Sequence, residues 1–196
     1  GLMMNQACSA DGFQQGVHYQ TLTKPVVTSD PSRVEVLELF WYGCPHCDTL
    51  DPVLKAWAQK LPSDVLFTRM PVVFGRSWEM HARMFWVAKN LGLLETIHEP
   101  LFNAIHREGQ RLQRVDDVVA FFERYGADPA VVKRELAGFA TESALRLADA
   151  RVRAYGIQGV PALVVNGQFV TGVSQAGGES RLFQLLDELI EKSRQK

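Results

Sequence analysis

The apolar positions along the chain change period several times, and these changes mark out its elements. Residues 34–41 (VEVLELFW) are almost continuously apolar, interrupted only by Glu35 and Glu38. Such a run predicts a strand that is buried on both faces of a sheet. In 45–61 the large apolar residues fall at helical spacing, which predicts a helix that ends at Leu61.

A second strand is predicted at 65–69 (VLFTR). Strand, helix and strand together predict a parallel pair joined by a right-handed crossover. From about Gly75 to Tyr155 the pattern is that of one helix after another, and Thr141 is predicted to cap the last of them. The breaks between these helices are predicted around Gly92, Gly109, Gly126 and Gly138.

The strand signal returns near the carboxyl end. Residues 162–165 (ALVV) are followed by Asn166-Gly167 and then by 168–170 (QFV), a strong signature of a two-residue hairpin. An amphipathic helix after Gly177-Gly178 closes the chain, and an edge strand is expected near 17–22. The organisation is therefore βαβ, a helical insert, then ββα.

Composition and charge exclude several classes of function. The chain has 196 residues, of which 46% are hydrophobic, so it is long enough for a core without the disulfides that small secreted scaffolds need. Its 21 basic and 22 acidic side chains leave no global field to attract nucleic acid. The apolar runs are far shorter than the roughly 20 residues that a membrane span requires.

The amino end, residues 1–10, is interpreted as a remnant of a signal peptide or of an expression tag. Cys8-Ser9-Ala10 fits the small-x-small pattern before a signal-peptidase cut, which would make Asp11 the first residue of the mature protein. A lipid-modified Cys8 is a third interpretation. After such a cut only Cys44 and Cys47 remain, an even pair that suits an oxidising compartment.

The candidate chemistry lies in Cys44-Pro45-His46-Cys47, where the buried strand turns into the helix. A Cys44 thiolate there faces the first free N–H groups of the helix and the positive end of its dipole, so its pKa is expected to be low. Pro45 suits the first helical turn because its missing N–H costs nothing there. His46 directly follows the nucleophile and can add positive charge or a hydrogen bond.

Cys47 lies about one helical turn after Cys44, a separation compatible with an unstrained disulfide. One alternative is half of a zinc site, but a structural zinc site needs four ligands and the chain has no second Cys pair or paired His cluster, so no metal is predicted. Another alternative is an inert structural disulfide. The preferred interpretation is thiol–disulfide exchange.

These motifs carry a family resemblance. LELFWYGCPHC (37–47), the helical middle, and GVPALVVNG (159–167) before a terminal helix resemble the DsbA family of thioredoxin-like disulfide oxidants, over a stretch from about Phe13 to Ile190. The resemblance implies an α/β, thioredoxin-like fold with an all-helical domain inserted between its two halves. The domains are then a discontinuous thioredoxin-like domain, 11–73 and 149–196, and an inserted helical domain, 74–148.

The resemblance also implies roles for particular residues. Cys44 is the exposed nucleophile and Cys47 its shielded partner. Pro161 is in cis and faces the cysteines, and the backbone of Val160 beside it holds an incoming extended peptide by strand-like hydrogen bonds.

Glu38 lies six residues before Cys44, the place of the buried acid in thioredoxin-like sites. Buried beneath the cysteines, it would have a raised pKa and could relay protons to or from Cys47. Arg69 is a possible counter-charge at the end of the second strand. The alternative is a solvated glutamate on an edge strand.

The resulting functional expectation is a dithiol oxidase. If the Cys44 thiolate is strongly stabilised, the dithiol form is more stable than the disulfide form. The Cys44–Cys47 disulfide then tends to be donated to reduced, folding secreted proteins. Pro45-His46 matches the oxidant pattern, whereas thioredoxin-like reductants usually have Gly-Pro there. The alternatives are a disulfide isomerase or reductase that uses the same site, and a peptide-binding chaperone.

The expected setting follows from that function. We expect a periplasmic monomer that uses no cofactor beyond its redox-active disulfide. Its partners are reduced unfolded proteins and, as the resemblance implies, a membrane quinone-linked reoxidant of the DsbB kind. His81, His98 and His106 have no ligand spacing and are predicted to be surface or capping residues.

Overall fold

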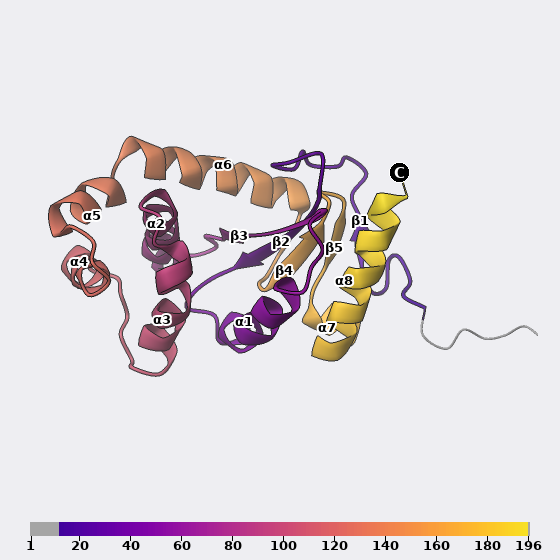
Figure 1. Cartoon of the computed structure of the whole chain (residues 1–196), viewed down its shortest axis with the longest axis horizontal. Helices are drawn as coiled ribbons and strands as arrows, with labels where there is room; N and C mark the ends of the chain where they lie inside the picture. Colours follow the sequence, from indigo (N-terminus) through magenta and orange to yellow (C-terminus); the bar gives the residue numbers. More distant parts are fainter. Residues whose placement is uncertain (1–11, 196) are drawn as a thin grey trace, which may run out of the picture.

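A five-stranded mixed sheet forms the centre of the fold (Figure 1). The computed structural model describes residues 12–195, so the interpretations of the amino end, of Cys8 and of Asp11 lie outside the described part. The strand order is β1-β5-β4-β2-β3. The strands are β1 (Gln20–Thr21), β2 (Val34–Phe40), β3 (Val65–Pro71), β4 (Ala162–Val165) and β5 (Phe169–Thr171).

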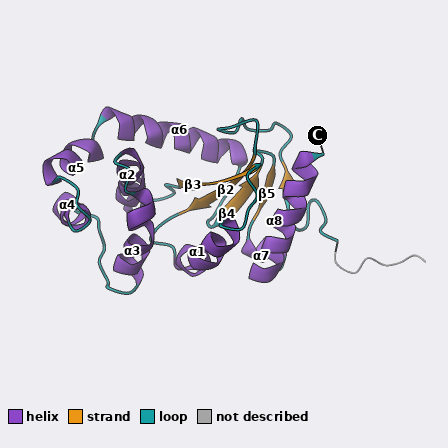
Figure 2. Ribbon diagram, viewed as in Figure 1, coloured by secondary structure: helices purple, strands orange, loops and turns teal. Residues whose placement is uncertain are grey.

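Eight helices are present in the part of the chain that the structure describes, and Figure 2 shows most of them gathered on one side of the sheet. The prediction of strands at both ends of the chain and helices between them is confirmed. The helices are α1 (Pro45–Ala58), α2 (Arg76–Asn90), α3 (Leu94–His106), α4 (Val115–Glu123), α5 (Pro129–Leu136), α6 (Phe139–Tyr155), α7 (Val173–Ala176) and α8 (Glu179–Arg194).

The central pairings follow the sequence pattern. β2 and β3 pair in parallel through the crossover helix α1, with Glu38 opposite Arg69 in the register. β4 and β5 form the expected antiparallel hairpin, and Asn166 and Gly167 both have positive φ, 53° and 64°. These are the backbone conformations that a two-residue turn between right-twisted strands needs. β1 adds the edge strand.

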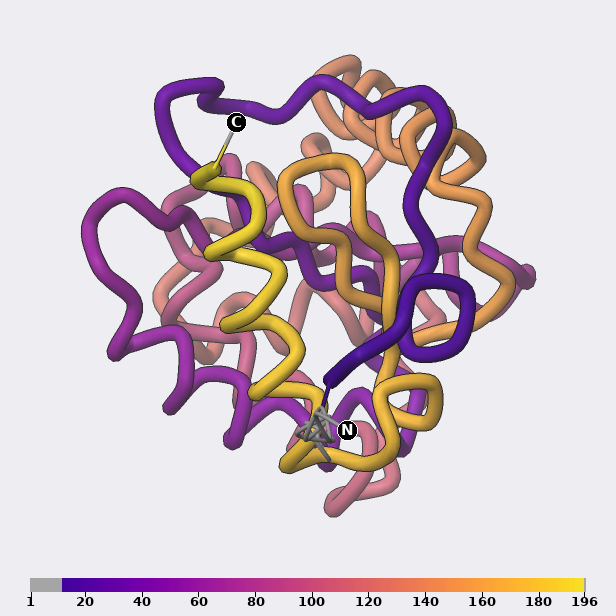
Figure 3. Tube along the Cα trace, turned by 90° about the vertical axis from the view of Figure 1, so that its right-hand side faces the viewer, coloured from indigo at the N-terminus to yellow at the C-terminus, as the bar shows by residue number. Residues whose placement is uncertain are grey.

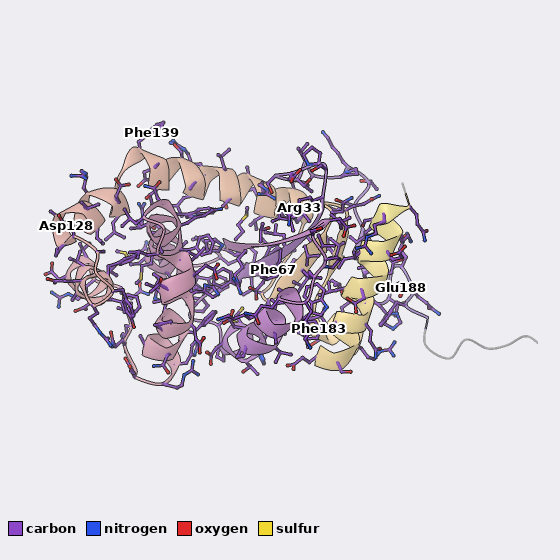
Figure 4. All side chains as sticks on the ribbon, viewed as in Figure 1. Arg33, Phe67, Asp128, Phe139, Phe183 and Glu188 are labelled. Carbon is purple, nitrogen blue, oxygen red and sulfur yellow. The ribbon has the colours of Figure 1, made fainter. Side chains whose placement is uncertain are left out.

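Side chains alternate between the two faces of the sheet along β2, and helices cover both faces, so the strand is buried on both sides. Val36 packs on the face covered by α1 and α8, and Leu37 on the face covered by the second half of α6. Phe67 of β3 and Phe183 of α8, both visible in Figure 4, pack against the first of these two clusters. Figure 3 shows α8 beside the β4–β5 hairpin in front of the rest of the molecule.

The helices α2 to α5 enclose a separate apolar cluster that reaches the sheet through Phe40 and Tyr42, and α6 begins against α2 and α5. α6 returns from this cluster to the sheet as one unbroken helix (Figure 1). It therefore runs through the predicted domain boundary between residues 148 and 149, and the exact bounds of the two domains stay predictions. Within residues 12–195, no helix has the length and apolar character needed to cross a membrane.

The predicted cap of α6 is wrong by three residues. Gly138 is the N-cap, and the Thr141 hydroxyl donates to the backbone oxygen of Glu135 at 2.7 Å. The threonine therefore satisfies a carbonyl at the end of α5 instead of an N–H at the start of α6, which ties the two helices together.

Candidate active site

Cys44 is the N-cap of α1, where β2 leads through a short turn into the helix. Its side chain accepts a hydrogen bond from the Cys47 backbone N–H, with a N···Sγ distance of 3.4 Å. Pro45 occupies the first helical turn. The two thiols are not bonded to each other, so the structure shows the dithiol form. Cys44 is 8% exposed, which is less than the resemblance implied for the nucleophile, and Cys47 is fully buried, so Cys44 is the more accessible of the two.

The surroundings of the two cysteines separate their pKa values. The pKa of Cys44 is lowered to about 6, mainly by the hydrogen bond from the Cys47 side chain and further by the Cys47 backbone N–H, although burial acts in the opposite direction. The backbone N–H of His46 and the positive charge of its exposed ring lower the pKa of Cys44 further. The pKa of Cys47 is raised because its thiol donates to Cys44 and is buried. One sulfur is therefore a stable thiolate at neutral pH and the other a stable thiol.

A loop from the far end of the chain closes over Cys44. The Val160–Pro161 peptide bond is cis, the isomer that the resemblance implied, and the Val160 carbonyl oxygen lies 3.8 Å from Cys44 Sγ. Beside this contact lies a cavity of about 660 Å³. Its lining includes His46, Leu50, Tyr155, Val160 and Pro161.

Glu38 lies on β2 in the interior of the sheet and its residue is 1% exposed, so the alternative of a solvated glutamate on an edge strand is wrong. Arg69 Nε lies 3.4 Å from Glu38 Oε1, which places the expected counter-charge beside it. The geometry does not make this contact a hydrogen bond, and both carboxyl oxygens of Glu38 lack a hydrogen-bond partner.

Burial raises the pKa of Glu38 to about 8, because desolvation and the nearby Asp51 carboxylate outweigh the attraction of Arg69. Glu38 in turn helps to raise the pKa of Cys47. The acid therefore holds a proton at neutral pH within electrostatic reach of the buried thiol.

The prediction that the histidines are surface or capping residues is wrong for two of them, whereas His106 is partly exposed in the last turn of α3. His81 and His98 are buried, 3% and 6% exposed. His98 bonds the Tyr42 hydroxyl through Nδ1 (2.7 Å) and Asp51 Oδ1 through Nε2 (3.0 Å). His106 bonds the Tyr42 backbone oxygen (2.7 Å).

These contacts come from the helical insert and hold the turn before Cys44. Tyr42, whose side chain is buried, is clamped at its hydroxyl and at its carbonyl by two histidines of α3. His81 of α2 accepts a hydrogen bond from the Trp41 ring nitrogen at 2.9 Å. The insert thus helps to fix the backbone from which the nucleophile projects.

The prediction of no metal is not tested by this structure, which describes only part of the chain. Among residues 12–195, no group of three or more His, Cys, Asp or Glu side chains is placed to hold a metal ion.

Comparison with known proteins gives a consistent result. The family model described as DSBA-like thioredoxin domain matches residues 54–189. The chain is 37% identical to a thiol:disulfide interchange protein DsbA of Pseudomonas aeruginosa, over 98% of this chain and 91% of that protein. It is 37% identical to the protein of the same name from Azotobacter vinelandii, over 96% of this chain and 88% of that protein.

Solved structures agree over the same length. The crystal structure of Pseudomonas aeruginosa DsbA superposes with a TM-score of 0.89 at 38% identity, covering 94% of this chain and 96% of the other. The oxidoreductase DsbA from Xylella fastidiosa superposes with a TM-score of 0.85 at 28% identity, covering 91% and 96%.

Proposed function

The chain belongs to the DsbA family of thioredoxin-like proteins, and from that premise we infer that it is a thiol:disulfide oxidoreductase acting on reduced substrate proteins. Its task is to donate the Cys44–Cys47 disulfide. The observation that carries this inference is the position of Cys44 at the N-terminus of α1, where its side chain accepts the Cys47 N–H.

The reaction begins when a substrate thiolate attacks Cys44 Sγ of the oxidised protein. A bond forms between the substrate sulfur and Cys44, the Cys44–Cys47 bond breaks, and its electron pair leaves on Cys47, which takes up a proton. A second substrate thiolate then attacks the substrate sulfur of the mixed disulfide, and Cys44 leaves as a thiolate. The substrate loses two electrons and gains a disulfide, while the protein becomes the dithiol; one proton ends on Cys47 and one in solvent.

The difference between the pKa values of Cys44 and Cys47 determines the direction of disulfide exchange. Cys44 is a good leaving group because its pKa is lowered to about 6, and Cys47 is poor at re-forming the bond because its pKa is raised. The dithiol is thus the low-energy form of the site, and its disulfide is donated readily.

The loop at Val160 supports a role in holding the substrate. Its carbonyl oxygen lies beside Cys44 Sγ, so a peptide with a cysteine bonded to Cys44 would run along this backbone. An extended segment there can pair with Val160 as a strand would, and the cavity beside Pro161 can receive neighbouring side chains.

The cycle needs a partner that removes two electrons, because each turnover leaves both cysteines reduced. The proposed reoxidant is a membrane quinone-linked protein of the DsbB kind, and the proposed state of the enzyme is a monomer. The periplasm is the proposed location because disulfides formed there persist. The proposal invokes no cofactor beyond the disulfide itself.

The experiment that tests the function is oxidation of a reduced, unfolded protein with several cysteines by the oxidised enzyme. We expect one substrate disulfide to appear for each enzyme disulfide lost. Efficient reduction of insulin together with failure to oxidise the unfolded substrate would indicate a reductase instead.

Replacing Glu38 with glutamine is expected to slow disulfide donation on the order of tenfold below pH 8, because glutamine cannot give a proton to Cys47. Glu38 itself loses its proton as the pH rises through about 8. The ratio of wild-type to Glu38→Gln rates is therefore expected to fall toward one above that pH. Taking the ratio removes the ionisation of the substrate thiol, and a ratio of one at every pH would exclude the proton role of Glu38.

A further inference from the structure

Arg69 faces two buried carboxyl groups from two different elements. Its Nε lies 3.4 Å from Glu38 Oε1 on β2, and its Nη2 lies 3.7 Å from Asp51 Oδ1 on α1. The side chains of Arg69, Glu38 and Asp51 are 11%, 1% and 6% exposed. One guanidinium is thus shared by two carboxyl groups that solvent scarcely reaches.

Asp51 has a second partner that Glu38 lacks. Since a carboxylate only accepts, the 3.0 Å contact with His98 places the proton of that ring on Nε2, and Nδ1 then accepts the Tyr42 O–H. Burial lowers the pKa of His98, so the ring is neutral at neutral pH and gives Asp51 a hydrogen bond without a charge. Neither oxygen of Glu38 has any hydrogen-bond partner.

Charge balance then decides which carboxyl group is ionised. The Cys44 thiolate acts on both Glu38 and Cys47, and the neighbouring Tyr42 phenol feels Arg69, Asp51, Glu38 and Glu95; apart from Arg69, none of these groups brings a positive charge. Two buried carboxylates beside one guanidinium would leave a negative charge unpaired, which is costly at low dielectric. Asp51 has both Arg69 and His98 as partners, whereas Glu38 has only its share of Arg69, so Glu38 is the group that keeps its proton.

We propose that Asp51, oriented by His98, is a positioning residue that holds a share of Arg69 and thereby keeps Glu38 protonated for the thiol-disulfide reaction. The inference rests on the proposed function, since it explains how the proton donor of that reaction is kept loaded. It also gives the helical insert a part in the chemistry, because His98 belongs to α3.

The test is the titration of Glu38 in the reduced Asp51→Asn protein, followed by NMR of ¹³C-carboxyl-labelled glutamate and assigned by the signal lost in Glu38→Gln. Asparagine keeps the size of the side chain and still accepts from His98, so only the charge is removed. The Arg69 guanidinium then pairs with Glu38 alone, and the Glu38 carboxylate is no longer repelled by a negative charge on residue 51. The Glu38 midpoint is expected to fall by about one pH unit or more.

Two variants control this measurement. Asp48→Asn removes the same charge from the same helix, but that carboxylate pairs with Arg107 at the surface (2.7 Å), so the Glu38 midpoint is expected to stay in place. Asp51→Glu restores the charge and is expected to restore the raised midpoint. If the asparagine variant does not fold, Asp51→Ser removes the same charge and gives the same comparison.

The outcomes separate this inference from the proposed function. An unchanged or raised midpoint in the uncharged Asp51 variants overturns the inference, whatever their activity. A lowered midpoint, with a pH profile of disulfide donation displaced by the same amount, supports it. A third outcome is that the Glu38 midpoint falls in the Asp51 variants while Glu38→Gln leaves the rate of disulfide donation unchanged. That result would support the sharing of Arg69 between Glu38 and Asp51 and would exclude transfer of the Glu38 proton to Cys47.

Discussion

Replacing Cys44 with serine is expected to reduce oxidation of an unfolded substrate to the rate of an enzyme-free control. The hydroxyl of serine can neither form the disulfide nor act as the leaving thiolate, so both steps of the exchange are lost. Cys47 cannot substitute for it, because its thiol is fully buried and its pKa is raised. The measurement is the rate of disulfide formation in the reduced substrate.

Cys47→Ser is the matched variant, since it keeps the nucleophile and removes only the resolving thiol. It is expected to collect mixed disulfides through Cys44 when offered a substrate disulfide, and Cys44→Ser is expected to collect none. If Cys44→Ser still binds an unfolded peptide and still promotes its folding at the wild-type rate, the protein is a peptide-binding chaperone and its cysteines are incidental.

The reduced protein is expected to unfold at a higher denaturant concentration than the oxidised protein. A disulfide ordinarily stabilises a fold by restricting the unfolded chain, but the loop between Cys44 and Cys47 is too short for a large gain. Forming that bond also removes the thiolate that the start of α1 stabilises. The reduced form therefore has the larger free energy of unfolding. Solvent screens the charge of the Cys44 sulfur, so the difference between the two forms is modest.

The pH dependence of this difference has a definite sign. The pKa of Cys44 is about 6 in the folded protein and 9.0 for an ordinary cysteine. A group with a lowered pKa contributes stability that is complete above the unfolded value and is lost as the pH falls through the folded value. The difference between the unfolding midpoints of the reduced and the oxidised protein should thus become smaller as the pH falls from 9.0 to about 6. An oxidised protein that unfolds at the higher denaturant concentration, or a difference between the two midpoints that does not change with pH, would show that the Cys44 thiolate does not stabilise the reduced form.

The arrangement around the cysteines follows from local signals in the sequence, which is why it was predictable. A buried strand, a turn and a helix that begins at Pro45 place Cys44 at a helix N-terminus without any long-range information. Asn166-Gly167 specifies the hairpin in the same local way. The pairing of Glu38 with Arg69 also follows from local order, because the two parallel strands bring them into register.

The partners of Asp51 were not predictable in that way. Asp51 and His98 lie on different helices, and their bond exists only because α3 docks on α1. A polar residue on an amphipathic helix is ordinarily assigned to the solvent face. A signal was nevertheless present, since His98 lies within the apolar stripe of α3, one turn after Leu94 and one turn before Phe102.

The ultraviolet absorbance of the thiolate in the reduced protein, followed against pH, shows directly whether Cys44 is ionised at neutral pH. Serine in place of Cys8 leaves only the two site cysteines to absorb. We predict a single rise with its midpoint near pH 6. If the Cys44 sulfur instead keeps its proton up to the ordinary cysteine value of 9.0, its thiolate is not stabilised in the dithiol form, and Cys44 is not the source of a strongly oxidising disulfide.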